Sequence, residues 1–284
     1  MNTFLKQSKS EDLQKVAAFT GEGAYHGSSK ARNLAIPENE VAEVVPHTIL
    51  EHLKNKTSPF TEFEAKFSNL AEIKQCLTIP LQEEVKNDDV TFVWCPLEIA
   101  LQEAGPVTKN VLQYMEHYLE KKKKFVYIDS KIQYFKTGDL PVDSKLWHVD
   151  GTIAVRDQRA TDLGYPLLHD MKARMLGLSP SPTYMAYQSS YHCATQFAVE
   201  PVAIKLPECI TSFDILDQRV QEAGAVCKSQ PAASIIKFDG LSLHRAVPAT
   251  ADGWRLWIRC VETDREVNLN SSIISCYGTV FRKT

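Results

Sequence analysis

The sequence predicts a mainly β protein with a helical N-terminal part, an α+β chain whose second half is an antiparallel sandwich or jelly roll. After residue 124, about eight stretches rich in β-branched and aromatic residues are separated by clusters of Pro, Gly and Asp. No helical pattern alternates with these stretches, as it would in a parallel βαβ sheet. Amphipathic helical patterns are instead concentrated before residue 125.

The overall composition is that of an ordinary globular protein. The 284 residues suffice for one large domain or two small ones, and the net charge of −3 argues against a general attraction to nucleic acid or an anionic membrane. The seven cysteines form no Cys-x-x-Cys pair, which favours reduced thiols. No apolar run approaches the roughly 18 residues that span a bilayer. We expect a cytoplasmic protein with neither a membrane nor a nucleic acid as partner; the oligomeric state is open.

Residues 1–124 are predicted to form a helical region that packs on the β-rich part. Apolar residues spaced three and four apart predict helices, and a short apolar run predicts one strand at 90–95. The clearest helix, 108–124, presents Val111, Leu112 and Met115 on one face and ends in four lysines, which suit the negative end of the helix dipole. The other predicted helices are 10–19, 40–54 and 60–76.

Residues 125–284 are predicted to form the β-rich core, in one integrated domain with the helical region. The insert at 157–182 contains several Pro and Gly residues and predicts a loop or short helix at the mouth of the β structure. The predicted strands are 125–135, 147–156, 183–190, 194–204, 210–216, 234–238, 254–262 and 273–281.

The strand at 254–262 carries two arginines on one face. Because a strand has a period of two, Arg255, Trp257 and Arg259 point to one side, and Leu256 and its alternate neighbours point to the other. Two guanidinium groups on an inner wall need an anion. Arg259 can bind a substrate anion, assist a cosubstrate, or pair with an internal acid such as Asp214. Asp239 is a second internal acid that could pair with Arg259. Trp257, between the two arginines, either packs in the inner face of the sheet or contacts substrate.

A His-x-Asp motif and a distant histidine form a candidate metal site. His148 and Asp150, two apart on a predicted strand, project to the same side and can ligate one ion. His244 stands at the start of the stretch that leads to the two arginines; Arg255 follows it by 11 residues and Arg259 by 15. The alternative is that these histidines are ordinary core residues.

These residues resemble a known family. His148, Asp150 and His244, followed by Arg255, are similar to the His-x-Asp…His…Arg signature of the iron(II) and 2-oxoglutarate-dependent dioxygenase superfamily. The spacing resembles that of the taurine-dioxygenase-like or the phytanoyl-CoA-hydroxylase-like branch. The resemblance implies a double-stranded β-helix, a cupin-like jelly roll flanked by helices, and it extends over residues 125–281 as architecture.

The resemblance also implies a chemistry and a role for each residue. The metal ligands would bind Fe(II), 2-oxoglutarate would take two open positions and O2 the third. Arg255 would hold the distal carboxylate of 2-oxoglutarate through two parallel hydrogen bonds. Apart from the resemblance, Gln133 and Thr152 lie on neighbouring predicted strands and are candidate hydrogen-bond donors to the cosubstrate, and Arg259 and Trp257 are candidates for contact with a small-molecule substrate. Oxidative decarboxylation would then be coupled to hydroxylation or desaturation of that molecule. Tyr184 and Tyr187 are further possible donors to the cosubstrate.

Two other functions remain open from the sequence. A cupin-like metal enzyme would use the same ligands without 2-oxoglutarate, and it would not depend on Arg255. A non-catalytic jelly-roll binding protein would bind neither metal nor cosubstrate. Binding of both together therefore separates the three classes.

Overall fold

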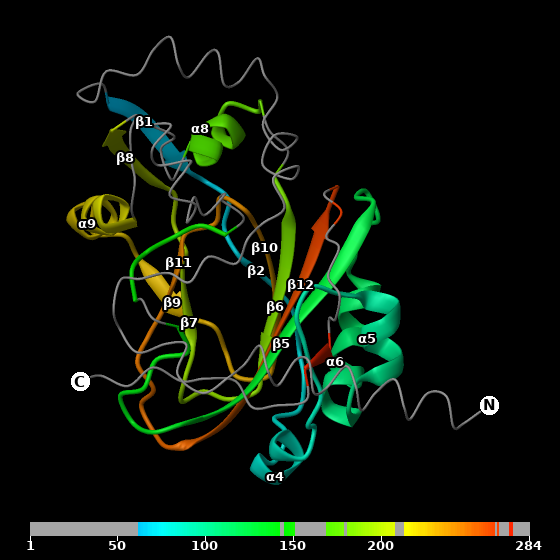
Figure 1. Ribbon diagram of the computed structural model, residues 1–284. Helices are drawn as coiled ribbons and strands as arrows, with labels where there is room; N and C mark the ends of the chain where they lie inside the picture. The colour runs from blue at the N-terminus through cyan, green and yellow to red at the C-terminus, as the bar shows by residue number, and fades with distance from the viewer. Residues whose placement is uncertain are drawn as a thin grey trace, which may run out of the picture.

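The protein is mainly β, with antiparallel sheets and few helices (Figure 1). The structure, a computed structural model, describes residues 62–142, 145–150, 169–178, 181–207, 213–264, 266 and 273–274. The helices predicted at 10–19 and 40–54 lie outside the described residues. In the described part, no helix is long and apolar enough to cross a membrane.

The largest sheet has six strands, and β12 lies in its middle. β12 pairs along its whole length with β5 and, over its second half, with β6, in both cases antiparallel. This register places Arg255 opposite Gln133, and Arg259 opposite Asp129. The strands run in the order β2 (Glu72–Cys76), β10 (Ser234–Asp239), β6 (Thr183–Gln188), β12 (Gly253–Thr263), β5 (Phe125–Phe135) and β4 (Cys95–Pro96).

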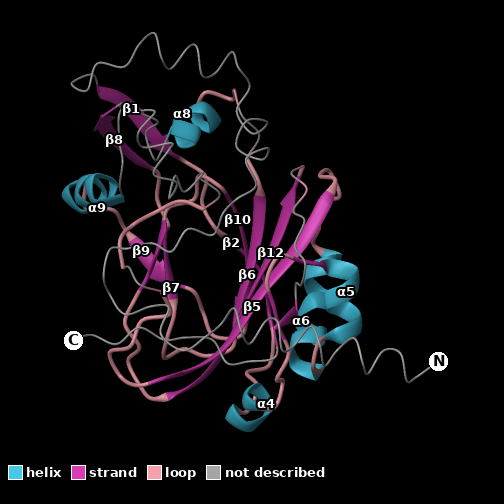
Figure 2. Ribbon diagram, in the orientation of Figure 1, coloured by secondary structure: helices cyan, strands magenta, loops and turns pink. Residues whose placement is uncertain are grey.

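Three smaller sheets complete the β structure in the described part of the chain (Figure 2). Each is again antiparallel. They are β11 (His244–Ala246) with β7 (Thr195–Ala198) and β9 (Cys227–Ser229); β1 (Glu62–Phe67) with β8 (Val202–Pro207); and β13 (Ile273–Ile274) with β3 (Thr91–Phe92).

The two faces of the six-stranded sheet are covered differently. Helices α5 (Leu97–Glu103) and α6 (Pro106–His117) lie on one side, and β7, β9 and β11 lie on the other (Figure 1). Leu256, Ile258 and Cys260 of β12 point into the helix-covered core. The arginines of β12 therefore face the side of the smaller sheet, as the period of two predicts. The remaining described helices are α4 (Gln82–Lys86), α8 (His169–Met175) and α9 (Phe213–Glu222).

The helix predicted at 60–76 is wrong, because these residues form β1 and β2. Residues 62–67 read Glu-Phe-Glu-Ala-Lys-Phe, and burial alternates along them, with Ala65 and Phe67 buried. The same apolar positions fit a helical spacing, so local sequence does not separate the two structures. Pairing with β8, far along the chain, selects the strand. The described part of the predicted helical region, 62–124, thus contains four strands besides α4, α5 and α6.

The strand predicted at 210–216 is also wrong, since α9 begins at Phe213. Leu216 and Val220, four residues apart, are the buried residues of this helix. The β-branched residues Ile210 and Thr211, just before the helix, suggested a strand. The spacing of the apolar residues that follow them is helical. Within the predicted strand 147–156, the described residues form a single β-bridge at His148. The insert at 157–182 contains α8, in agreement with the predicted short helix.

The start of α6 depends on a buried carboxylate from outside the helix. Asp88, which is fully buried, accepts hydrogen bonds from the backbone N–H of Val107 at 2.8 Å and of Thr108 at 2.9 Å. The hydroxyl of Thr108 donates to the same carboxylate. Asp88 therefore caps the helix that covers the back of β12.

Replacing Asp88 by alanine is expected to lower the free energy of unfolding by about 2–3 kcal/mol, because three buried donors lose their acceptor. Denaturant unfolding followed by circular dichroism measures the change. Glu116→Ala, which removes an exposed carboxylate from the same helix, serves as the control and is expected to change stability by less than about 0.5 kcal/mol. Equal effects of the two substitutions would contradict a capping role for Asp88.

Candidate metal centre

Two predicted ligands are joined through their backbones. The N–H of His148 donates to the carbonyl of His244 at 3.0 Å, and the N–H of His244 donates back to His148 at 3.0 Å. This reciprocal pair forms an isolated antiparallel bridge between the segment 145–150 and β11. The imidazole rings consequently lie side by side, with centroids 4.3 Å apart.

Asp150 completes a cluster that can hold a metal ion. One ligand atom each from His148, Asp150 and His244 lies within 4.8 Å of the others. His244 Nε2 lies 3.7 Å from Asp150 Oδ1. Ligands at about 2.1 Å from one ion lie about 3 Å apart on adjacent positions, so small side-chain rotations bring these atoms onto a common ion. Within the described residues, this is the one cluster of at least three such groups.

Both histidines are held in the tautomer that a metal requires. His148 Nδ1 lies 2.9 Å from the carbonyl oxygen of Leu146, and His244 Nδ1 lies 2.9 Å from that of Ser242. A carbonyl oxygen can only accept, so each Nδ1 carries the hydrogen. The lone pair of each imidazole is therefore on Nε2, the atom that faces Asp150 in the case of His244.

The electrostatics of the cluster suit a cation. Burial and the neighbouring His244 lower the pKa of His148 to about 4, which keeps its imidazole neutral at pH 7. Burial alone would raise the pKa of Asp150, but Arg259, followed by His244, outweighs this and lowers that pKa below its ordinary value. The donor set at neutral pH thus includes the neutral imidazole of His148 and the carboxylate of Asp150.

Aromatic side chains enclose the histidines. The Phe197 ring stacks on His244 at a centroid distance of 5.3 Å, and Phe238 meets the same ring edge-on at 5.4 Å. Phe213, at the start of α9, lies 5.9 Å from the ring of His148. The apolar contacts fix the ring planes, and the Asp150 side chain retains 18% of its exposure.

Arg259 makes two ion pairs in this structure. Its Nη1 donates to Asp150 Oδ2 at 3.0 Å, and its Nη2 donates to Asp129 Oδ2 at 2.7 Å. The acid partners considered from the sequence, Asp214 and Asp239, are not the ones it binds. Arg259 therefore contacts the metal site through a ligand, and its proposed contact with a substrate stays a prediction.

Arg255 is buried with no acidic partner among the described residues. It is 2% exposed, and its Nη2 donates a long hydrogen bond to Gln188 Oε1 at 3.5 Å. Its Nε has no hydrogen-bond partner in the described structure. Burial lowers the pKa of Arg255 below its ordinary value. A guanidinium in this condition is a natural receptor for a carboxylate that enters the interior.

The other residues predicted for the site fall into three groups. The first group lies near the arginines. Gln133 is buried directly opposite Arg255 on the neighbouring strand. The ring of Trp257, which stands between the two arginines on β12, lies 5.6 Å from the Arg259 guanidinium. Thr152 lies outside the described residues. Tyr184 also faces Arg259, at 5.7 Å from its ring centroid, whereas Tyr187 packs in the core under the helices and points away from the arginines.

Two residues near the site were not identified from the sequence. Asp129 is an acid in the middle of an apolar strand, a signal that a buried cation lies nearby. Gln188, at the end of β6, contacts Arg255. Strand pairing, which places Arg259 opposite Asp129 and Trp257 opposite Gln188, is what brings both to the site.

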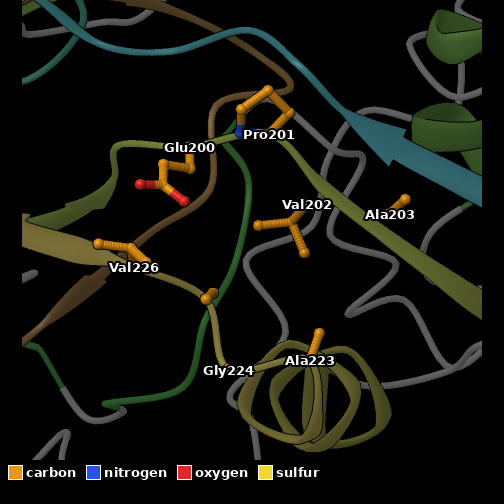
Figure 3. Close-up of a pocket in the computed structure, with 8 residues that line it drawn as sticks. Glu200, Pro201, Val202, Ala203, Ala223, Gly224 and Val226 are labelled. Atoms are coloured by element: carbon orange, nitrogen blue, oxygen red, sulfur yellow. The ribbon is translucent and has the colours of Figure 1, made fainter.

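A shallow hollow elsewhere on the surface offers no comparable chemistry. It lies between the start of β8 and the end of α9, and it is lined by Glu200, Pro201, Val202, Ala203, Ala223, Gly224, Ala225 and Val226 (Figure 3). Glu200 is its single charged residue, and no histidine or arginine lines it. A lone carboxylate does not make a metal or anion site.

No protein-family model matches the sequence, and no curated protein matches it. The geometry around His148, Asp150 and His244 therefore carries the functional inference.

Proposed function

We propose that the protein is a non-haem iron(II) oxygenase that couples oxidative decarboxylation of 2-oxoglutarate to hydroxylation or desaturation of a small molecule. The observation that carries the proposal is the cluster of two imidazoles and one carboxylate, with both Nδ1 hydrogens engaged by carbonyl groups. Two histidines and one carboxylate on one side of an ion leave further positions open, an arrangement typical of non-haem iron oxygenases.

Arg255 supports 2-oxoglutarate as the cosubstrate. It lies four residues from Arg259 on β12, or about 13 Å along the strand, and Arg259 reaches Asp150. Both arginine side chains extend toward the same side of the sheet, opposite Leu256 and Ile258, and in this proposal the distal carboxylate of 2-oxoglutarate binds the Arg255 guanidinium. Bound iron would supply the oxidising chemistry, while the chain's own residues orient the acid and hold its distal charge.

Each residue has a distinct task in this proposal. His148 and His244 present Nε2 to the iron, and Asp150 presents Oδ1. Gln188 contacts Arg255 at 3.5 Å and Gln133 lies opposite it on β5, so both amides would be near a carboxylate bound to this arginine. Phe197 and Phe238 keep water from one side of the His244 ring.

The test is an anaerobic titration of the full chain with Fe(II) and then 2-oxoglutarate, followed by visible absorption. We expect a weak metal-to-ligand charge-transfer band that requires both components. His148→Ala is expected to lose it, and Glu200→Ala, which removes the carboxylate of the distant hollow, is expected to keep it. Metal binding without the band would favour a cupin-like metal enzyme that does not use 2-oxoglutarate. Absence of metal binding would favour a non-catalytic binding protein.

A further inference from the structure

Arg259 links the metal ligand Asp150 to the rigid centre of the large sheet. Asp129 and Arg259 are directly opposite one another on β5 and β12. Asp129 Oδ2 accepts from both Nε and Nη2 of Arg259, at 3.3 and 2.7 Å. The third side of the guanidinium, Nη1, donates to Asp150 Oδ2. One planar group thus ties a ligand on an irregular segment to two adjacent long strands.

Three aromatic rings around Arg259 restrict the position of its guanidinium further. The rings of Trp94, Tyr184 and Trp257 lie 5.9, 5.7 and 5.6 Å from its guanidinium. The backbone N–H of Trp94 donates to Asp129 Oδ1 at 2.8 Å, so both oxygens of Asp129 are engaged. Arg259 therefore has its charge matched by two carboxylates and its position fixed by three rings.

The two carboxylate oxygens of Asp150 make different contacts, and this difference is the main support for the inference. Oδ2 is engaged by Arg259, whereas Oδ1 is the oxygen that approaches His244 Nε2. An Asp150 held in this way offers one oxygen to an ion and keeps the other from it. Groups that hold a ligand's second atom commonly set its orientation and basicity.

We infer that Arg259 is a positioning residue that holds Asp150 as a one-oxygen ligand, with Asp129 as its anchor. This role rests on the proposed metal site. It leaves the coordination position that a second Asp150 oxygen would fill open for other ligands. Under this role the charge of Arg259 is balanced by Asp150 and Asp129, so no substrate anion is needed. The competing assignment is that Arg259 binds the substrate.

The test compares Mn(II) affinity of the wild-type chain with Arg259→Gln and Asp129→Asn, using the electron paramagnetic resonance signal of free Mn(II) and the metal alone. If charge were the whole effect, removing the arginine would tighten Mn(II) binding and removing the aspartate would weaken it. A positioning role predicts that both substitutions weaken binding, by about tenfold or more. Opposite directions, or no change in either variant, would overturn the inference.

Arg259→Lys provides a second measurement that keeps the charge. A lysine has one compact donor group and cannot span both carboxylates, so we expect weaker Mn(II) binding here too; unchanged affinity would count against positioning. The exposed pair of Arg219 and Glu62 gives matched controls, and Arg219→Gln and Glu62→Gln are expected to leave affinity unchanged. Thermal unfolding of every variant identifies those that do not fold.

A structure of the wild-type chain with Mn(II) tests the inference without substitution. It should show Asp150 bound through one oxygen, with Arg259 on the other, and two-oxygen binding would overturn the inference. Failure of the proposed function would give a different result, because the wild-type chain would then bind Mn(II) no better than His148→Ala. If wild type binds and His148→Ala does not, the metal site stands whatever the Arg259 variants do.

Discussion

Replacing His244 by alanine is expected to abolish 2-oxoglutarate-dependent succinate formation, with a decrease of about three orders of magnitude or more. In the proposed metal site the imidazole is one of three ligands, and a bound metal would contribute several kcal/mol of transition-state stabilisation that is lost with it. Succinate released in the presence of Fe(II), 2-oxoglutarate and O2 measures the effect. If the proposed function holds, uncoupled decarboxylation would give a background rate that this assay measures without a primary substrate.

The control for His244→Ala is His117→Ala. His117 is exposed on α6, and its ring contacts Tyr118. Its replacement is expected to leave succinate formation unchanged. Because the ring of His244 also packs between Phe197 and Phe238, thermal unfolding of the variant must be measured beside activity. A folded His244→Ala protein with the wild-type rate would refute the metal site.

Replacing Arg255 by methionine is expected to weaken 2-oxoglutarate binding about a hundredfold without lowering the stability of the ligand-free protein. The loss corresponds to about 3 kcal/mol, the contribution of two hydrogen bonds between charged groups. Stability should not fall, because the variant removes a buried charge that has no acidic partner among the described residues. Equilibrium binding of 2-oxoglutarate to the Mn(II) protein and denaturant unfolding measure the two effects.

Two further variants make the Arg255 result specific. Arg255→Lys keeps the charge but not the planar pair of donors, and it should recover part of the affinity. Arg219→Met removes an exposed arginine on α9 and should change neither quantity. Metal-dependent activity that survives in Arg255→Met, with unchanged cosubstrate affinity, would instead favour the cupin-like reading.

The parts of the fold that follow from local sequence were predicted well. The strand at 254–262 is confirmed, together with the division of its faces, because alternation of arginines with Leu256, Ile258 and Cys260 is a local pattern. The same holds for β5 and for the start of α6, whereas the predicted end at 124 is wrong: α6 ends at His117, so the four lysines lie beyond the helix. The cluster of His148, Asp150 and His244 was also predicted from residue types and spacing, and the structure brings these side chains together.

What the sequence did not predict depends on contacts between distant residues. Residues 62–67 carry a pattern that fits a helix or a strand, and the partner strand β8 is about 140 residues away. Asp129 was missed as the partner of Arg259 because only the register of β5 on β12 places the two opposite each other. Gln188 reaches Arg255 for the same reason. Antiparallel pairing is set by the whole sheet, so a single strand does not contain that information.

The backbone bridge between His148 and His244 has a consequence for the order of folding. The two ligands are separated by about 96 residues, and closing a flexible loop of this length costs on the order of 4 kcal/mol of chain entropy. Short local segments therefore cannot assemble the donor set by themselves. The ion would be captured late, after β11 has found the segment around His148, and metal uptake during refolding would report the completion of this long-range pairing rather than its beginning.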